Sequence, residues 1–558
     1  MSLAATVAEK ANLIWAIADK LTGVFKPHQY GEVILPLTVI RRFDSVLEPT
    51  KEMVLQAART FAGTPLEETM LCNAAGHKFY NTSPFTFTRL LDAPDDLEPN
   101  FRAYCNAFSP NVRQILERFK PFGPHLTTMA EKNVLYMVLK EFTTSKADLH
   151  PSRVSNLEMG YIFEELIRRF SEAHNEDAGQ HYTPREVIEL MVNLLLTHDN
   201  ATLAGTGATT TIYDPACGTG GMLSVAEEHI HRCNSAASLL LCGQEINDET
   251  FAICKADMLI KGQDADYIKL GNTLSNDQFP GQTFDYVLSN PPFGREWKNE
   301  KAAVEREAAR PEGRAAIIQN GSPLFTGDAG SGPSEIRRSI LENDYLDAII
   351  ALPNDIFYNT GIATYIWLLC KNKPQARRGK VQLINASGLY EKRRKALGNK
   401  RNDIPQKAIA KICRLYGDFA ESPLSRIFDV ADFGYTRITV ERPALPASGT
   451  EDAPAAPADA PKKRGRKPGK PKADASRRDT ENVPLKEDIQ AYFAREVLPF
   501  APDAWIDGSK SKVGYEIPFT RYFYEYTPPR PAAELAVELH ELELRLGESL
   551  AALFGDED

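Results

Sequence analysis

The residues best suited to chemistry stand in a row, Ser289-Asn290-Pro291-Pro292-Phe293, directly after the largely apolar run 284–288. The two prolines fix the backbone and remove two N–H donors, which leaves the Asn290 side chain and nearby carbonyl oxygens as acceptors in a rigid corner. Such acceptors suit an exocyclic amine, and Phe293 offers a face on which a planar ring can stack, as enzymes that act on an extruded base require. Taken alone, the same string is equally typical of a strand that ends in a proline turn.

A second candidate site is the glycine-rich turn Asp214-Pro215-Ala216-Cys217-Gly218-Thr219-Gly220-Gly221-Met222. Its glycines allow a tight turn and a close approach of a ligand to the backbone, and Asp214 stands at its mouth, where a carboxylate can receive a cationic amine. The turn has neither the Gly-x-Gly-x-x-Gly spacing of dinucleotide sites nor the Gly-Lys-Ser/Thr of phosphate-binding loops. The sequence therefore predicts a zwitterionic nucleoside ligand. We interpret Cys217 as a small packing residue and not as a nucleophile.

Two further predicted strand ends carry polar groups. Glu245 lies at the end of the predicted strand 239–246, where a carboxylate can hold a ribose diol through two hydrogen bonds. Asn272 and Thr273 follow the predicted strand 267–270 and can reach an adenine edge. Each feature alone fits an ordinary strand-end turn, but three of them in chain order before the Asn290 corner favour one shared site.

The elements that must position these residues alternate between strands and helices from residue 210 onward. This alternation predicts an α/β fold, a doubly wound and Rossmann-like parallel sheet with helices on both faces. Ligands of such sheets bind at the carboxyl ends of the strands. The predicted strands are 211–213, 239–246, 267–270, 284–289, 314–318, 346–352, 364–370 and 381–385, and the helices between them include 222–233, 248–261 and 333–341.

The residues before the sheet read as helices. Residues 1–150 show apolar stripes at helical spacing and are predicted to form an all-helical domain. After a further helix over 160–170, Thr183 is a candidate N-cap, with Pro184 at the first helical position and Glu186 completing a capping box. The start of such a helix presents free N–H groups, which can bind an anion.

Composition limits the function classes. The formal net charge is −10 over 558 residues, so any contact with DNA must be local or shared with a partner. Eight scattered cysteines without a Cys-x-x-Cys pair argue against a zinc ribbon and a disulfide scaffold, and we expect no metal. No apolar run approaches the roughly 18 residues of a membrane span, and there is no signal pattern at the N-terminus. The expectation is a soluble cytoplasmic protein.

Three features lie outside the predicted site. The basic run 392–395, with Lys400 and Arg401, is typical of a solvated helix face, although a phosphate contact beside the target base is an alternative. Residues 446–480, Ala/Pro-rich and then Lys/Arg-rich, are predicted to be a disordered linker that could also touch a DNA minor groove. The helix 532–554 carries leucines at spacings of three and four, as in a core helix or a partner helix.

Together these motifs resemble the DNA N6-adenine methyltransferases that use S-adenosylmethionine. Within that group the chain is similar to the modification subunit of a type I restriction-modification system, because it has no target-reading domain between the two motifs. The resemblance extends over nearly the whole chain: an N-terminal helical domain (1–150), a methyltransferase catalytic domain (151–445), the linker (446–480) and a C-terminal tail with a subunit-contacting helix (481–558). Besides the two motifs above, it is carried by Gln180–Pro184, Phe325–Asp328 and Phe357–Thr364.

The resemblance implies a cofactor, S-adenosyl-L-methionine, and a role for each candidate residue. The catalytic residues would be Asn290, Pro291, Pro292 and Phe293: an extruded adenine would stack on Phe293, and its amine would donate hydrogen bonds to Asn290 and to the Pro291 carbonyl. The cofactor-binding residues would be Tyr182, Thr183, Asp214, Gly218 and Gly220 at the methionine part, Glu245 at the ribose, Asn272 and Thr273 at the adenine, and also Pro184, Pro215 and Thr219.

The resemblance also implies partners. They are double-stranded DNA, a specificity subunit that recognises the target, and a motor-nuclease restriction subunit, with two modification subunits on each specificity subunit and no membrane. The final helix, 532–554, would then pair with helices of the specificity subunit.

Two departures from the family keep alternatives open. Asn272 stands where the family has an acid, and the link 294–313 is shorter than usual, with a predicted helix at 300–309 whose face holds only alanines and Val304. A thinly packed sheet would favour a catalytically weak scaffold subunit of the same complex. A protein glutamine methyltransferase, with an Asn-Pro-Pro-Tyr corner, is a further alternative, and the helical N-terminal domain, the upstream His-Tyr-Thr-Pro and Phe293 argue against it.

Overall fold

The structure is a computed structural model that describes residues 3–172, 183–197, 209–294, 313–358, 360–444, 473–524, 526 and 529–554. Residues 1–517 form one compact unit, and residues 518–558 form a second. Tyr182, most of the link 294–313, Asn359 and most of the predicted linker lie outside the described residues.

The N-terminal part is helical, as predicted, and is built around α2 (Tyr30–Leu47), whose residues are almost all buried. A helix buried on every side must pair its own charges. In α2, Arg41 Nη1 lies 2.6 Å from Asp44 Oδ2, and the Tyr104 hydroxyl donates to Asp44 Oδ1. The other helices are α1 (Leu3–Ala18), α3 (Lys51–Phe61), α4 (Glu67–Ala75), α5 (Phe87–Leu90), α6 (Leu97–Asn106), α7 (Pro110–Leu116), α8 (Phe122–Glu131), α9 (Leu135–Phe142) and α10 (Asn156–Glu172).

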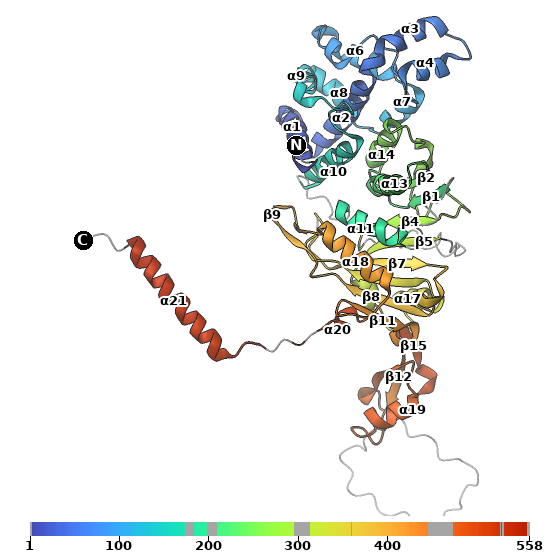
Figure 1. Ribbon diagram of the computed structural model, residues 1–558, viewed down its shortest axis with the longest axis vertical. Coiled ribbons are helices and arrows are strands. Elements are labelled where there is room, and N and C mark those ends of the chain that lie inside the picture. Colours follow the sequence, from blue (N-terminus) through green and yellow to red (C-terminus); the bar gives the residue numbers. More distant parts are fainter. Residues whose placement is uncertain are drawn as a thin grey trace, which may run out of the picture. The chain divides into compact units, whose positions relative to one another are not determined.

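The core is a nine-stranded sheet in the order β11-β8-β6-β7-β5-β4-β1-β2-β3 (Figure 1). The expected parallel sheet is corrected to a mixed one, because β7 runs antiparallel to both of its neighbours, β5 and β6. Parallel neighbours need a crossover, usually a helix, and the link from β6 to β7 has no helix in its described part. The strands are β1 (Thr209–Asp214), β2 (Ser238–Glu245), β3 (Ile268–Leu270), β4 (Tyr286–Ser289), β5 (Arg314–Asn320), β6 (Leu346–Ala351), β7 (Thr364–Cys370), β8 (Lys380–Asn385) and β11 (Ser425–Asp429).

The directions of the strands define two edges of the sheet. The strands β1 to β6 and β8 all run the same way, so their last residues lie along one edge, here called the carboxyl edge, and their first residues lie along the opposite amino edge. Asp214, Glu245 and Ser289 are the last residues of β1, β2 and β4. The sheet therefore brings the candidate residues to one edge, as the sequence predicted.

Helices cover the faces of this sheet. The helix α11 (Arg185–Leu196), which precedes β1 in the chain, packs against β4, β5, α13 (Gly221–Cys233) and α18 (Gln406–Asp418). The helix α14 (Asp248–Ile260) packs against β2 and β3 and also against α2, α7 and α10, so one continuous apolar core joins the N-terminal helices to the sheet. Two further helices of this part are α16 (Ser322–Phe325) and α17 (Gly332–Glu342).

The basic run 392–395 is not on a helix. It lies in β9 (Glu391–Leu397), which pairs antiparallel with β10 (Lys400–Asp403), and this β9–β10 hairpin corrects the interpretation as a helix face. Its two-residue loop is Gly398-Asn399, a pair typical of tight hairpins, with Gly398 at φ +58°. In the sequence, the Gly398-Asn399 pair indicates the hairpin, whereas the run of charges does not indicate the secondary structure.

A small sheet forms from both sides of the predicted linker. Its strands are β12 (Gly434–Glu441), β13 (Asp479–Pro484), β14 (Trp505–Ile506) and β15 (Lys512–Tyr515), and β12 pairs with each of the other three. Residues 473–480 of the expected disordered linker are thus ordered, because β13 satisfies its backbone groups on β12. Residues 445–472 lie outside the described residues, and the strands on either side of them, β12 and β13, pair with each other.

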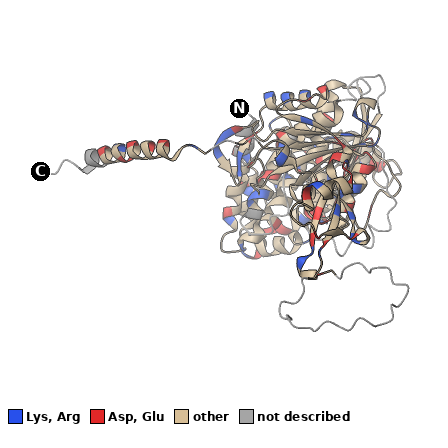
Figure 2. Cartoon of the chain, turned by 90° about the horizontal axis from the view of Figure 1, so that it is seen from below, with Lys and Arg blue, Asp and Glu red and all other residues tan. Residues whose placement is uncertain are grey.

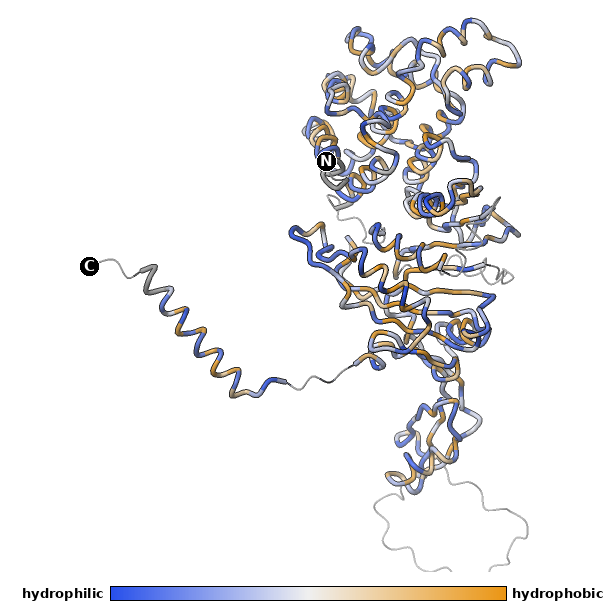
Figure 3. Tube along the Cα trace, viewed as in Figure 1, coloured by the Kyte–Doolittle hydropathy of each residue, from blue (hydrophilic) through white to orange (hydrophobic). Residues whose placement is uncertain are grey.

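In the second unit, α20 (Phe519–Tyr522) is followed by α21 (Ala532–Phe554), with the bounds that the sequence predicted. Hydrophobic residues recur along α21 (Figure 3). Leu535, Leu539, Leu542 and Leu546 are all exposed within this unit. None of the helices in the described part of the chain has the length and apolarity of a membrane span.

Candidate active site

The glycine-rich turn lies between β1 and α13. Gly218 and Gly220 have φ of +54° and +84°, and a Cβ at Gly220 would lie 2.8 Å from Cys254 Sγ. The backbone N–H of Cys217 donates to the carbonyl of Gln244 in β2 over 3.0 Å, and a Cβ at Gly243 would lie 2.9 Å from Cys217 Sγ. The turn therefore requires glycine where it approaches α14, and the buried Cys217 serves packing.

Asp214 is more enclosed than the sequence suggested. The residue is 2 % exposed and so does not stand at an open mouth, and its Oδ1 accepts the backbone N–H of Ala216 over 3.0 Å. Burial raises the pKa of this carboxyl to about 7, and the nearby charge of Glu245 acts in the same direction. Burial therefore favours the protonated form of Asp214 at a pH where an exposed aspartate is ionised.

Glu245 connects the turn to the end of β2. Its Oε2 accepts the N–H of Gly218 over 2.8 Å, and its Oε1 accepts the N–H groups of Ile246 and Asn247. These three backbone donors fix the orientation of the carboxylate at the carboxyl edge. The structure thus brings Glu245 and the glycine-rich turn together.

Asn272 and Thr273 also lie at this edge, after β3. Asn272 Oδ1 accepts the N–H of Leu274 over 2.9 Å, as in an Asx turn. The Thr273 hydroxyl donates to the carbonyl of Pro215 and so ties the end of β3 to the glycine-rich turn. Within the described residues, these side chains hold the shape of the edge.

The Asn290 corner follows β4 directly. Asn290 is half-buried, and its Nδ2 donates to Thr183 Oγ1 over 2.8 Å. Pro291 and Phe293 are half-buried as well, with Phe293 against the apolar core, while Pro292 is exposed. The amide of Asn290 is thus held by its NH2 group, which sets the direction of its oxygen.

Thr183 has a different role from the expected one. The helix α11 begins at Arg185 with Pro184 at its N-cap and no side-chain cap, so the predicted capping box is wrong. The Thr183 hydroxyl accepts from Asn290, and the Glu186 carboxylate pairs with Lys400. Both side chains are engaged by residues far along the chain, and such tertiary contacts outweigh the local cap.

The sequence-based prediction for Lys400 is wrong. The basic run to which it belongs is typical of a solvated helix face, but Lys400 is 1 % exposed. Its Nζ contacts the Glu186 carboxylate and the carbonyls of Ile356 and Asn402, and lies 3.0 Å from Asp403 Oδ1. Nothing in the local sequence distinguishes it from the exposed cations beside it.

Glu164 of α10 was also missed. A Cβ at Gly221 would lie 2.7 Å from Glu164 Oε1, so this carboxyl group lies against the first residue of α13. Burial and then the charge of Asp257 raise its pKa to about 8, against the opposite effect of Lys261. In the sequence, Glu164 is one of several polar residues on an amphipathic helix, with no spacing that relates it to the turn.

The donors and acceptors at the carboxyl edge fit a nucleoside that carries an amino-acid group. The carboxylate of Asp214 suits an ammonium group, that of Glu245 suits a diol, and the turn with left-handed Gly218 and Gly220 allows close approach. In the described part of the chain, no three His, Cys, Asp or Glu side chains are grouped as metal ligands.

The link after the corner was expected to leave the sheet thinly packed. Residues 295–312 lie outside the described residues, so this expectation stays a prediction. On either side of the link, β4 and β5 pair in parallel from Tyr286 and Arg314 to Ser289 and Ile317, and α11 packs against both strands.

Comparison with known proteins identifies the family of the chain. The N-6 DNA methylase family model matches residues 155–311 and 306–435, about half of the chain, and the model of the HsdM N-terminal domain matches residues 10–142. The curated relatives include the type I restriction enzyme MjaIX methylase subunit of Methanocaldococcus jannaschii, 26% identical over 72% of this chain and 76% of that protein. Another is the HindI methylase subunit of Haemophilus influenzae, 28% identical over 41% of this chain and 54% of that protein.

Solved structures show the same fold. The type I restriction-modification methyltransferase subunit from Streptococcus thermophilus matches with a TM-score of 0.59 at 20% identity, over 76% of this chain and 97% of that one. At this identity the likeness shows the fold alone, which is the methyltransferase-type α/β core with N-terminal helices that the sequence predicted. With the family model matched from residue 155 to 435, the chain belongs to the N-6 DNA methylase family, which confirms the resemblance seen in its motifs.

Proposed function

We infer that the chain is a DNA adenine-N6 methyltransferase that uses S-adenosyl-L-methionine and acts as the modification subunit of a type I restriction-modification complex. The observation that carries this function is the hydrogen bond from Asn290 to Thr183 at the carboxyl edge, beside the acid-led glycine-rich turn. It gives a base-holding corner and a nucleoside-holding turn at one edge of one sheet.

The cofactor half of the site consists of residues from β1 and β2. Asp214 holds the ammonium group, and Glu245 holds the ribose diol with the oxygen lone pairs that its three backbone donors leave. Thr183, Pro184, Pro215, Gly218, Thr219 and Gly220 line the approach, Asn272 and Thr273 lie toward the adenine, and Tyr182 is outside the described residues. When bound, S-adenosylmethionine supplies an electrophilic methyl group.

The base half of the site is the Asn290 corner. Because Thr183 holds the Asn290 Nδ2, the amide oxygen keeps the orientation of an acceptor, and together with the Pro291 carbonyl it accepts hydrogen bonds from the two N–H groups of the adenine amine. These hydrogen bonds draw the nitrogen lone pair out of conjugation and direct it at the methyl group. Phe293 stacks on the extruded base. The chain's contribution is therefore positioning and electrostatics.

Partners follow from the same proposal. The chain acts in the cytoplasm on double-stranded DNA, together with a specificity subunit that recognises the target and a motor-nuclease subunit that restricts, with two copies of the chain per specificity subunit. The exposed leucines of α21, Leu535, Leu539, Leu542 and Leu546, form the stripe that pairs with helices of the specificity subunit.

The test is methyl transfer by the chain co-expressed with its specificity subunit. We expect tritiated methyl groups to appear in DNA, and Asn290→Ala to lower the rate by about 10³-fold or more, since it removes an acceptor that acts in the transition state. The variant should bind S-adenosylmethionine as the unaltered chain does, measured by calorimetry. Methyl transfer that is indifferent to Asn290→Ala would overturn the assigned role.

A further inference from the structure

The β9–β10 hairpin, residues 391–403, is strongly basic in an acidic chain. Positions 392–395, 400 and 401 are all Lys or Arg, whereas the hairpin contains only two acidic residues, Glu391 and Asp403. The whole chain has a formal net charge of −10, so this cation density is local. Figure 2 shows Lys and Arg in blue along the chain, and Figure 1 labels β9.

The six cations divide into two that hold the hairpin and four that do not. Lys400 is buried against Glu186, and Arg393 Nη1 contacts both oxygens of Asp403 over 2.6 and 2.7 Å. The other four, all exposed, make no ion pair with any described residue: Lys392, Arg394, Lys395 and Arg401.

The hairpin lies at the carboxyl edge. It follows β8, whose last residue, Asn385, is at that edge, and the backbone N–H of Arg401 donates to the carbonyl of Asp355 in the loop that follows β6. Lys400 contacts Glu186, which stands three residues after Thr183, the hydrogen-bond partner of Asn290. One chain of contacts thus connects the hairpin to the base-holding corner.

Grouping several cations on a two-stranded hairpin destabilises that hairpin. A two-stranded ribbon is marginally stable alone, and like charges side by side destabilise it further. A chain with a net charge of −10 also repels DNA, so binding needs a local group of cations beside the point of reaction. An array of exposed cations without carboxylate partners, anchored by one buried lysine, meets that need.

We propose that the β9–β10 hairpin binds backbone phosphates of the DNA next to the extruded adenine, through Lys392, Arg394, Lys395 and Arg401. The proposal rests on the proposed function, because the phosphates belong to the DNA that the Asn290 corner acts on. Phosphate contacts of this kind set the register of the duplex and carry no sequence information, which suits a subunit whose target is recognised elsewhere.

A matched pair of triple variants tests the proposal in the full chain assembled with its specificity subunit. One variant is K392Q/R394Q/K395Q. The control is K371Q/R378Q/K380Q, which likewise removes two lysines and one arginine. These three residues are exposed and lie after β7 and at the start of β8, at the amino edge. Fluorescence anisotropy on a mixed-sequence duplex, at several salt concentrations, gives the affinity and its salt slope, and calorimetry gives the affinity for S-adenosylmethionine.

We expect the hairpin variant to bind the duplex at least about tenfold more weakly and to lower the salt slope by up to about 2.7, since each phosphate contact contributes about 0.9. The control should stay within about twofold, and both should bind S-adenosylmethionine normally. Equal DNA binding by the two variants would overturn the proposal. So would loss of the specificity subunit from the purified hairpin variant, because that result assigns the cations to a protein contact. An unaltered complex that transfers no methyl group contradicts the proposed function instead.

Discussion

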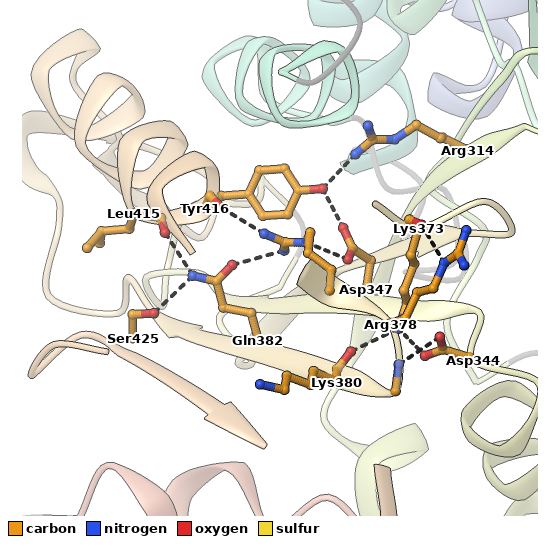
Figure 4. A network of polar contacts seen from close by, with 12 residues as sticks. Arg314, Asp344, Asp347, Lys373, Arg378, Lys380, Gln382, Leu415, Tyr416 and Ser425 are labelled. Atoms are coloured by element: carbon orange, nitrogen blue, oxygen red, sulfur yellow. Dashed lines mark hydrogen bonds and ion pairs between the residues drawn. The ribbon is translucent and has the colours of Figure 1, made fainter. Parts of the chain in front are cut away.

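The two edges of the central sheet use the same kinds of side chain for opposite purposes. At the amino edge, Arg377 donates to Asp347 Oδ1 over 2.7 Å and to Gln382 Oε1 over 3.0 Å, and Tyr416 donates to Asp347 Oδ2 (Figure 4). Arg314 donates in turn to the Tyr416 hydroxyl. Each charge in this network meets a side chain of complementary chemistry.

At the carboxyl edge the carboxylates of Asp214 and Glu245 are held by backbone N–H groups. Glu245 accepts three backbone N–H groups, and the buried Asp214 accepts one and has a pKa raised to about 7. No described Lys or Arg side chain pairs with either carboxylate. A buried acid without a cation is costly to ionise. From this difference we expect that the amino edge serves stability and that a ligand bound at the carboxyl edge would bring the cation.

The largest expected effect is on stability and comes from the amino edge. Arg377→Met leaves Asp347 buried without its cation, which should lower the free energy of unfolding by about 3–5 kcal/mol. Urea denaturation measures the change. The rate of methyl transfer by the fraction that remains folded should stay within about twofold, because the network touches no residue of the carboxyl edge. The double variant Arg377→Met, Asp347→Asn should recover part of the loss, and a rate that falls with Arg377→Met alone would contradict the division between the edges.

The second expected effect combines features of both edges. Lys400 and Glu186 form a buried ion pair, as residues of the amino edge do, but they lie at the carboxyl edge. Lys400→Met should lower the free energy of unfolding by about 2–3 kcal/mol, less than Arg377→Met, since the Glu186 side chain is 18% exposed. It should also lower the rate of methyl transfer about tenfold. The ion pair fixes Glu186 at the start of α11, and this helix start positions Thr183, which precedes it in the chain. A Lys400→Met variant that loses stability but keeps its full rate would group this pair with the amino edge.

The control for that experiment is Lys400→Arg with Glu186 unchanged. Arginine keeps the charge and a donor toward Glu186, so the rate should recover more than the stability, because the buried space fits lysine.

The comparison also shows what the sequence can reveal. Alternating apolar runs predicted the strand positions, and the parallel direction of β1, β2 and β4 was enough to bring Asp214, Glu245 and Asn290 to one edge. Local patterns carry this information, because each strand end is next in sequence to the residue that it positions.

Contacts between distant residues could not be predicted in this way. The described part of the link before β7 contains no crossover helix, and the apolar run 364–370 alone does not reveal that the strand is antiparallel. Thr183 and Asn290 are 107 positions apart, and Lys400 and Glu186 are 214 positions apart. The rule for helix caps predicted that Thr183 caps its own helix, but its side chain bonds Asn290. The rule that runs of charge are solvated predicted an exposed Lys400, but Lys400 is buried.

A smaller effect separates positioning from chemistry at the carboxyl edge. Thr183→Val removes the acceptor of the Asn290 amide, which should lower kcat about tenfold, or about 1.4 kcal/mol, while KM for S-adenosylmethionine changes less. Steady-state methyl transfer measures both constants. Thr183→Ser, which keeps the hydroxyl, should restore kcat. If valine raised KM and left kcat unchanged, Thr183 would be a cofactor contact alone.

The smallest effect is a pH dependence that the amino edge should lack. An ammonium group binds the ionised form of Asp214, so the affinity for S-adenosylmethionine should weaken a little less than tenfold from pH 7.5 to pH 6, as the carboxyl with a pKa of about 7 is protonated.

The stability of the ligand-free protein should show the opposite dependence on pH. Because the folded pKa lies above the ordinary value of 3.8, the folded state holds the proton more tightly, and this group's contribution to stability falls as the pH rises from about 4 to about 7. Asp214→Asn should bind the cofactor more weakly, flatten the affinity profile and shift Tm upward most at pH 8. Parallel profiles for the two proteins would show that Asp214 does not receive the cationic group.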